Sequence, residues 1–369
     1  MNIRSFQLRV SGRNRYYDLI PQFAYRKEGR YQYSPTMPAD LDGIGFIGWL
    51  PYFNKRWTAA TDKLAFKEFC SANGLRTPRY STQAADHLNG YIIKQPLSSF
   101  GYNIRGPFRN PDHADLRSRA GPNEYYEEFI SGKIAKAWYW DDKLVCLELL
   151  PMPTVIGDGA HTLAQLIAGA VVPPNAPLER GEIEALVRFQ NVSLDEVIPV
   201  GKTVLADFRY GSPLFPQTME NRNVIAKLAS TDAGRQFVSA GPALWRTIPD
   251  NERSATLYTV DAIVDGEDRV WLLEMNCNPT VHPDAYVSML EGLFGPAQEG
   301  VPNAMPVLPT LGPAVAPPPG FPHPWPMSPP PPGVLASGPF IAPSGAFSPG
   351  APPPSPPPAS APGFVPKQS

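Results

Sequence analysis

The chain has few cysteines and no long apolar segment. Only three cysteines occur among its 369 residues, at positions 70, 146 and 277. Their odd number and wide spacing provide neither a disulfide framework nor a zinc site, which is typical of a reducing compartment. The first ten residues, MNIRSFQLRV, lack the apolar core of a signal peptide, and no run approaches the ~18 apolar residues of a membrane span. The sequence therefore predicts a cytoplasmic protein without a membrane partner.

An excess of charge of either sign is also missing. The chain has 32 Lys and Arg against 34 Asp and Glu, a net charge of −2. Proteins that bind nucleic acid or anionic membranes through electrostatics usually carry a clear basic excess. The composition therefore favours small molecules or peptides as partners over nucleic acid.

Proline, by contrast, is abundant and concentrated at one end. Of the 47 prolines, 26 lie between residues 296 and 369, with one acid and one base among these 74 residues. Such a segment cannot form a regular helix or an internal sheet, and it has little apolar surface to bury. We expect residues 296–369 to form a disordered proline-rich tail, which could dock on a proline-recognising partner.

The first 295 residues are long enough for a sizeable core. Within them we expect a short N-terminal region, residues 1–57, with strands and little helix, followed by a main domain at 58–295. In that domain the patterns predict helices and strands at these positions: helices at 61–73, 180–189, 219–229 and 231–246, a helix to 169 after an N-cap at Thr162, and strands at 91–95, 124–131, 134–140 and 143–150. Antiparallel strands that alternate with helices indicate the α+β class.

A predicted β-hairpin at 257–283 carries the main candidate for a metal site. Asp261 lies in its first apolar run, and Glu274 and Asn276 end the second, two residues apart and so on one face of their strand. Two carboxylates and an amide oxygen form the hard oxygen site that suits Mg²⁺ holding phosphate oxygens. An acidic turn followed by an Asn-Pro loop is the alternative interpretation.

A second candidate is Lys94, at the end of the strand YIIKQ. The following loop contains Ser98, Ser99 and Gly101, whose backbone N–H groups could help the ammonium to hold a phosphate. The alternative is a lysine whose ammonium reaches solvent from the end of a strand.

Six segments in this order resemble the ATP-grasp superfamily of carboxylate–amine ligases, and most closely its cyanophycin-synthetase-like branch. The resemblance covers about residues 58–290. The segments are TDKLAFKEFCSANGLRTP (61–78), YIIKQPLSSFGYNI (91–104), YYEEFISGK (125–133), VIGDGAHTLAQLI (155–167), VSLDEVIPVGKTVLADFRYGS (192–212) and the hairpin ending in LLEMNCNP. The resemblance implies an ATP-grasp fold, in which two α+β lobes clamp ATP.

The resemblance also implies residue roles. Lys63 and Lys94 would hold the ATP phosphates, with Ser99 and Gly101 in the phosphate loop. The segment Glu127, Glu128, Phe129 and Ile130 would line the adenine, with hydrogen bonds from Glu127 and from the backbone of Phe129 and Ile130. Mg²⁺ would be bound by Asp261, Glu274 and Asn276, and Arg209 would contact the transferred phosphate. Phosphoryl transfer requires positioned cations of this kind.

The chain departs from the family pattern at several positions. Ile134 stands where relatives usually have an acid for the ribose, and Lys136 stands where many members of the branch have arginine. The loop after Lys94 has a single glycine, and the N-terminal region is shorter than a usual substrate-binding domain.

Three functions remain open on the sequence. The first is an ATP-dependent ligase that forms an acyl-phosphate and then an amide or peptide bond from small-molecule or peptide carboxylate and amine substrates. The second is a kinase with the same fold, and the third is a catalytically weakened ATP-binding scaffold with a docking tail.

Overall fold

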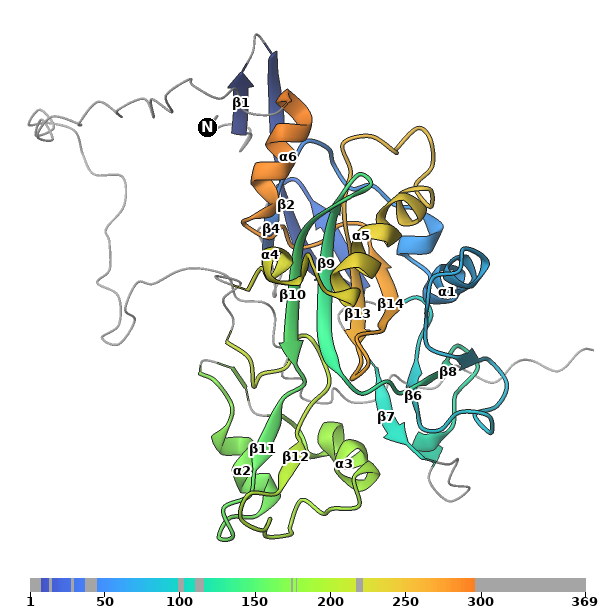
Figure 1. Ribbon diagram of the computed structural model, residues 1–369, viewed down its shortest axis with the longest axis vertical. Coiled ribbons are helices and arrows are strands. Elements are labelled where there is room, and N and C mark those ends of the chain that lie inside the picture. Colours follow the sequence, from blue (N-terminus) through green and yellow to red (C-terminus); the bar gives the residue numbers. More distant parts are fainter. Residues whose placement is uncertain are drawn as a thin grey trace, which may run out of the picture.

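The computed structural model describes residues 8–12, 15–27, 30–36, 45–98, 103–109, 116–173, 175–176, 178–216 and 222–295. It contains four β-sheets and six α-helices within these ranges, which confirms the α+β class (Figure 1). The predicted tail at 296–369 lies outside the described residues. None of the helices in the described part has the length and hydropathy that a membrane crossing requires.

A four-stranded antiparallel sheet forms most of the described N-terminal region. Its long strand β2 pairs with all three of the others. The bounds are β1 Leu8–Gly12, β2 Arg15–Lys27, β3 Arg30–Ser34 and β4 Gly45–Leu50. Short strands with little helix were expected here. The strand β2 is longer than expected, because Pro21 interrupts its apolar pattern and hides the strand in the sequence.

The central sheet has the order β10-β9-β13-β14, and all of its pairs are antiparallel. Its strands are β9 Lys133–Trp140, β10 Lys143–Pro151, β13 Leu257–Val264 and β14 Val270–Asn276. Helices α1 (Lys63–Ala72) and α5 (Asp232–Trp245) cover one face. Buried Phe66 of α1 and Phe237 of α5 join Tyr139, Leu147 and Tyr258 of the sheet in the main core.

The opposite face of this sheet is divided into zones. At one end Trp138 and Trp140 pack against helix α6 (Ala285–Phe294) and the N-terminal sheet, through Leu19 and Met289. At the other end Ile134 begins a second apolar cluster. Since alternate residues of a strand share a face, Lys136 lies on this face between the two apolar zones.

Two smaller sheets complete the fold. One has the order β5-β8-β6-β7, with β5 Tyr80–Ser81, β6 Tyr91–Lys94, β7 Arg105–Phe108 and β8 Tyr125–Glu128. The other pairs β11 Thr154–Ile156 with β12 Thr203–Leu205, and α2 Leu163–Gly169 and α3 Arg180–Phe189 lie beside it (Figure 1). The remaining elements are the short helix α4 (Ile225–Leu228) and the 3₁₀ turns Thr58–Ala60 and Leu116–Ser118.

Candidate functional site

A row of four charged side chains crosses the central sheet. Glu148 of β10 is paired in register with Lys136 of β9, Lys136 with Asp261 of β13, and Asp261 with Glu274 of β14. Residues that are directly opposite on antiparallel strands project from the same face. The row therefore lies between the two apolar zones of the face that α1 and α5 leave uncovered.

The three predicted metal ligands are brought together in this row. Asn276 Nδ2 donates to Asp261 Oδ2 over 3.2 Å, and Asp261 faces Glu274 across the strand pair. Burial and the neighbouring Glu274 raise the pKa of Asp261, despite the opposing effect of Lys136. Two carboxylates side by side with an amide fit a hard divalent cation. The described residues contain no cluster of three or more His, Cys, Asp or Glu side chains for a metal, so the amide would be the third donor.

Both carboxylates are paired with lysines. Lys63 Nζ of α1 lies 3.0 Å from Glu274 Oε2, and Lys136 Nζ lies 2.6 Å from Asp261 Oδ1. Lys63 also donates to the backbone oxygen of Ser98, in the loop after β6. Burial alone would raise the pKa of Glu274, but the charges of Lys63 and Lys94 lower it. The site thus combines two carboxylates, which could bind a metal ion, with lysine ammonium groups that surround them.

Glu127 and two lysines form a buried triad beside the row. Lys94 Nζ and Lys67 Nζ each lie 2.7 Å from a different oxygen of Glu127. Tyr125 donates its hydroxyl to Glu127 Oε2 over 3.2 Å, and Lys67 donates to Thr77 Oγ1 over 3.0 Å. The side chains of Glu127 and Lys67 are fully buried, and Lys94 is 5% exposed. Both carboxylate oxygens of Glu127 therefore contact lysines, and its hydrogen bond to the adenine stays a prediction.

The charges in this triad support one another. Burial alone would raise the pKa of Glu127, but the two ammonium groups bring it down to about 2. Burial lowers the pKa of Lys67, whereas Lys94 has a raised pKa because Glu127 and then Glu274 outweigh its own burial. Lys94 thus lies within the electrostatic reach of the predicted metal ligand Glu274.

The other residues predicted for the nucleotide have varied surroundings. Glu128 forms an ion pair with Arg79 at 2.7 Å, and the Phe129 backbone N–H donates to Gly90 O over 2.9 Å. Ile130 packs against the apolar cluster that begins at Ile134. Ser99 and Gly101 lie outside the described residues. The roles assigned to these residues stay predictions.

Arg209 and its neighbour Tyr210 occupy different surroundings. Asp207 accepts two hydrogen bonds from the Arg209 guanidinium, at 3.0 and 3.2 Å, and its side chain is nearly fully buried. Tyr210 instead donates its hydroxyl to Glu148 over 2.8 Å, and its ring centroid lies 5.0 Å from Lys136 Nζ. A tyrosine that the sequence did not single out is therefore in direct contact with the charge row, and the phosphate contact of Arg209 stays a prediction.

A buried apolar cluster lies beside the row. Its buried members are Ile134, Met152 and Ile263, and Phe208 and Leu273 pack against them. Ile134, where an acid was expected from the family pattern, is 4% exposed in this cluster.

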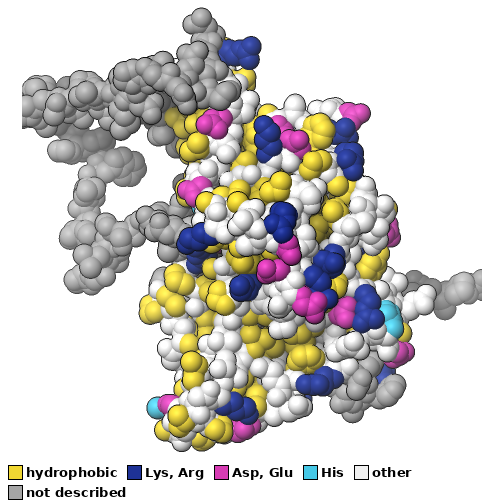
Figure 2. Space-filling model, viewed as in Figure 1, with side chains coloured by type: hydrophobic (Ala, Val, Ile, Leu, Met, Phe, Trp, Pro, Cys, Tyr) yellow, Lys and Arg dark blue, Asp and Glu magenta, His cyan; other side chains and the backbone are white. Residues whose placement is uncertain are grey.

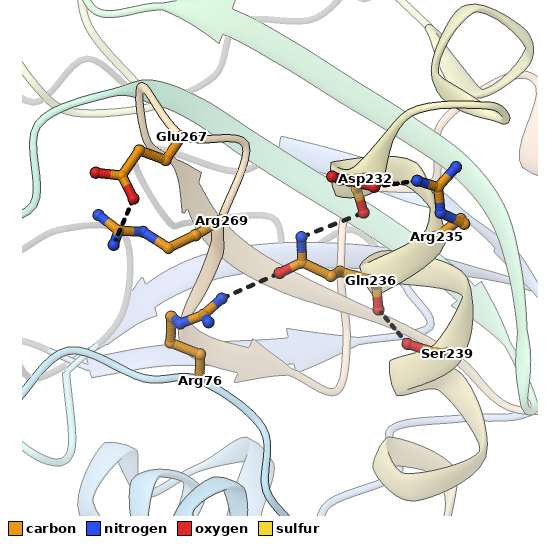
Figure 3. Close-up of a pocket in the computed structure, with 7 residues that line it drawn as sticks. All are labelled: Arg76, Asp232, Arg235, Gln236, Ser239, Glu267 and Arg269. Atoms are coloured by element: carbon orange, nitrogen blue, oxygen red, sulfur yellow. Dashed lines mark hydrogen bonds and ion pairs between the residues drawn. The ribbon is translucent and has the colours of Figure 1, made fainter.

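A separate pocket lies on the other face of the central sheet (Figure 3). It has a volume of about 430 Å³ and lies between α5 and the turn of the β13–β14 hairpin. Its charges are mostly paired: Arg235 contacts Asp232, and Arg269 Nη1 lies 2.7 Å from Glu267 Oε2. On the face shown in Figure 2, basic and acidic side chains are likewise intermixed. None of the residues predicted for nucleotide or metal lines this pocket, so we place the candidate site at the charge row.

Sequence reasoning missed four members of the site. Lys67 and Tyr125 contact the predicted Glu127, Tyr210 lies against Lys136, and Glu148 is the strand partner of Lys136, which was noted only as a departure. Lys67 had one local signal, because it is four residues from Lys63 and so on the same side of α1. The pairing of Glu148 with Lys136 depends on strand register, which the sequence does not give.

Neither a protein-family model nor a curated protein matches the chain. Solved structures similar to it include a bifunctional glutathione synthetase from Pasteurella multocida, at 13% identity and a TM-score of 0.33, covering 70% of this chain and 36% of that one. A D-alanine–D-alanine ligase from Bacillus anthracis has 12% identity and a TM-score of 0.33, covering 64% of each chain. The ATP-grasp ligase PsnB, solved with a minimal precursor, has 12% identity and a TM-score of 0.32, covering 64% of this chain and 62% of that one.

The chain thus spans between 36% and 64% of the length of these three proteins. Superposition at such TM-scores is partial. The roles proposed below therefore depend on the side-chain contacts of this chain.

Proposed function

We propose that this protein is an ATP-dependent carboxylate–amine ligase. The observation that carries the proposal is the contact between Lys63, predicted for phosphate, and Glu274, predicted for metal, at 3.0 Å. Lys94 adds a second cation whose charge interacts with Glu274. Two lysines from outside the central sheet thus converge on the carboxylates of that sheet, as binding of a metal–triphosphate requires.

Nucleotide binding would use the apolar cluster that contains Ile134 and the charge row beside it. The adenine would lie against the apolar cluster of Ile134 and Met152, and the phosphates would reach Lys63 and Lys94. Asp261, Glu274 and Asn276 would hold Mg²⁺, which would supply positive charge to neutralise the phosphates. Glu127 would fix the Lys94 ammonium, because its Oε1 lies 2.7 Å from Lys94 Nζ.

The proposed reaction has two steps. A substrate carboxylate oxygen bonds to the γ-phosphorus as the bond to ADP breaks, which gives an acyl-phosphate and ADP. The amine nitrogen then bonds to the acyl carbon, phosphate leaves, and the amine loses a proton. In both steps the lysines stabilise negative charge on phosphate oxygens, which is the main contribution that a protein makes to phosphoryl transfer.

The test is to measure ADP and phosphate separately, with ATP, Mg²⁺ and a panel of amino acids as both acids and amines. A ligase releases both products only when acid and amine are present. Release of ADP without phosphate would instead show a kinase, and nucleotide binding without turnover would show a scaffold.

The metal site has its own variant. Glu274→Gln should abolish turnover because it removes one of the two carboxylates that would hold the cation. Glu267→Gln, on the exposed turn of the same hairpin, is the matched control and should keep wild-type turnover. Near-wild-type ADP release by Glu274→Gln would show that the metal assignment is wrong.

A further inference from the structure

Lys136 lies between two carboxylates, one on each neighbouring strand. Asp261 of β13 and Glu148 of β10 are both paired with it in register. Adjacent strands are about 4.8 Å apart, so both carboxylates start one strand spacing from the lysine backbone. In this structure the ammonium is on the Asp261 side, with Nζ 2.6 Å from Oδ1. The lysine thus has a second acidic neighbour on its other side.

Glu148 has one oxygen ready to accept another donor. Its Oε2 accepts the hydroxyl of Tyr210 over 2.8 Å and lies 3.6 Å from Arg222 Nη1. No described residue donates a hydrogen bond to Oε1, and His282 Nε2 is 3.6 Å away, beyond hydrogen-bond distance. The side chain is fully buried. A buried carboxylate oxygen without a donor is unfavourable and calls for a partner in another state of the site.

Aromatic rings flank the lysine between these two positions. Lys136 Nζ lies 5.0 Å from the ring centroid of Tyr210 and 5.9 Å from that of Trp138. Ring faces attract cations, so an ammonium that leaves Asp261 stays in a favourable environment. The Tyr210 hydroxyl, bound to Glu148, also keeps that carboxylate in place at the far side.

We infer that Lys136 exchanges between Asp261 and Glu148 according to whether a divalent cation is bound. Without the cation, the ammonium neutralises Asp261, which faces the like-charged Glu274. When the cation takes Asp261, the ammonium turns to Glu148, whose Oε1 accepts no hydrogen bond from the described residues and has His282 Nε2 3.6 Å away. The inference rests on the metal site of the proposed function, and it makes Lys136 and Glu148 positioning residues that set the affinity of that site.

The exchange can be tested through metal binding alone, without nucleotide or turnover. Mn²⁺ also prefers carboxylate and carbonyl oxygens and is counted directly by electron paramagnetic resonance. Lys136→Met removes the competitor and should tighten Mn²⁺ binding. Glu148→Gln removes the second partner and should weaken it. In the double variant the loss caused by Glu148→Gln should largely disappear, a coupling of at least about threefold in the dissociation constant.

Further variants separate the exchange from a general charge effect. Glu148→Asp keeps the charge but retracts the carboxylate by one methylene, so it should also weaken Mn²⁺ binding when Lys136 is present. Because it keeps a buried anion beside Arg222, it serves as well if Glu148→Gln does not fold. The exposed Lys133→Met and Glu196→Gln are controls and should bind Mn²⁺ as the wild type does.

Two negative results have different meanings. If the wild type binds Mn²⁺ and the Lys136 and Glu148 substitutions act additively, the exchange is overturned and the metal site stands. If the wild type binds no Mn²⁺, with or without ATP, the metal site of the proposed function fails and the exchange fails with it.

Discussion

Glu127 stays charged although solvent does not reach its side chain. Taking a carboxylate out of water is costly, and here two lysine contacts and a tyrosine hydroxyl offset that cost. Removing one partner from such a buried set is more damaging than replacing the whole set, because a charge is left uncompensated. The triad therefore sets strict limits on substitution at Glu127.

We expect the stability contributed by Glu127 to depend on pH. Its folded pKa of about 2 lies below the value of 4.5 for a free glutamate, so the unfolded chain binds more protons between these values. The contribution is complete above about pH 4.5 and is lost as the pH falls toward 2, on the order of 3 kcal/mol in all. The stability difference between wild type and Glu127→Gln, from urea unfolding, should therefore narrow over that range. If the stability difference between wild type and Glu127→Gln stays constant over this pH range, the lowered pKa of Glu127 is contradicted. The exposed Glu267→Gln is the control.

Lys94→Met should weaken nucleotide binding in addition to its effect on stability. Loss of a charge-assisted contact to phosphate should weaken ATP binding by roughly 1.5–3 kcal/mol in Lys94→Met. Since Lys94 also holds Glu127, the variant starts from a lower melting temperature, and the informative quantity is the shift that Mg-ATP adds. That shift should be small in Lys94→Met and of wild-type size in the exposed control Lys133→Met. Equal shifts in all three proteins would remove Lys94 from the site.

Residue identity alone predicted only the residues with a local signal. Asp261, Glu274 and Asn276 follow a hairpin pattern, and the structure brings all three together. Lys67 was not predicted although it lies one helical turn from Lys63, and it is fully buried. Its burial depends on Glu127, sixty residues away, arriving beside α1. Contacts of that kind come from packing between elements, which a single sequence does not encode locally.

At the scale of elements, helix ends were predictable and strand partners were not. Asp62 caps α1 by accepting from the backbone N–H groups of Leu64 and Ala65, and Gly74 follows with a φ of +67°. Thr162 and Gln165 form the capping box of α2. The helix expected at 219–229 is shorter, however, because only Ile225–Leu228 is helical and residues 217–221 lie outside the described part. The bulge at Leu273, which leaves this residue unpaired between Leu272 and Glu274, had no sequence signal.

The contact of α5 with the β9–β10 turn depends on a glycine. A Cβ at Gly241 would lie 2.1 Å from the backbone oxygen of Asp142. Alanine normally stabilises a helix interior relative to glycine by about 1 kcal/mol, but here the backbone would have to shift. We expect Gly241→Ala to destabilise the protein by about 1–3 kcal/mol, as overpacking does. Urea unfolding would measure the change in stability, with Gly266→Ala as the control because a Cβ there meets no neighbour. If Gly241→Ala is more stable than the wild type, the close packing at Gly241 is contradicted.

At the scale of the molecule, the candidate site exists only where separate sheets meet. Lys94 and Glu127 come from β6 and β8, and Asp261 and Glu274 come from β13 and β14. Lys63 on α1 connects the two groups, since it contacts Glu274 and also Ser98 after β6. The order of the six segments, through their resemblance to the ATP-grasp superfamily, predicted that these residues converge. The distances between the sheets could come only from the folded chain.

The last prediction concerns how much of the chain this assembly needs. The hydrophobic clusters of the described part draw their members from residues between Leu8 and Phe294. In the cluster that contains Trp138 and Trp140, helix α6 packs together with the N-terminal sheet. The proline-rich composition of 296–369 gives that segment little apolar surface to add. Truncation after Gly295 should therefore leave the melting temperature and the shift induced by Mg-ATP unchanged in thermal unfolding. A second truncation that also removes α6 should lower the melting temperature strongly, because Ala285, Met289 and Leu293 are buried. A large drop on removing 296–369 alone would show that the segment packs on the body and that the domain boundary lies beyond Gly295.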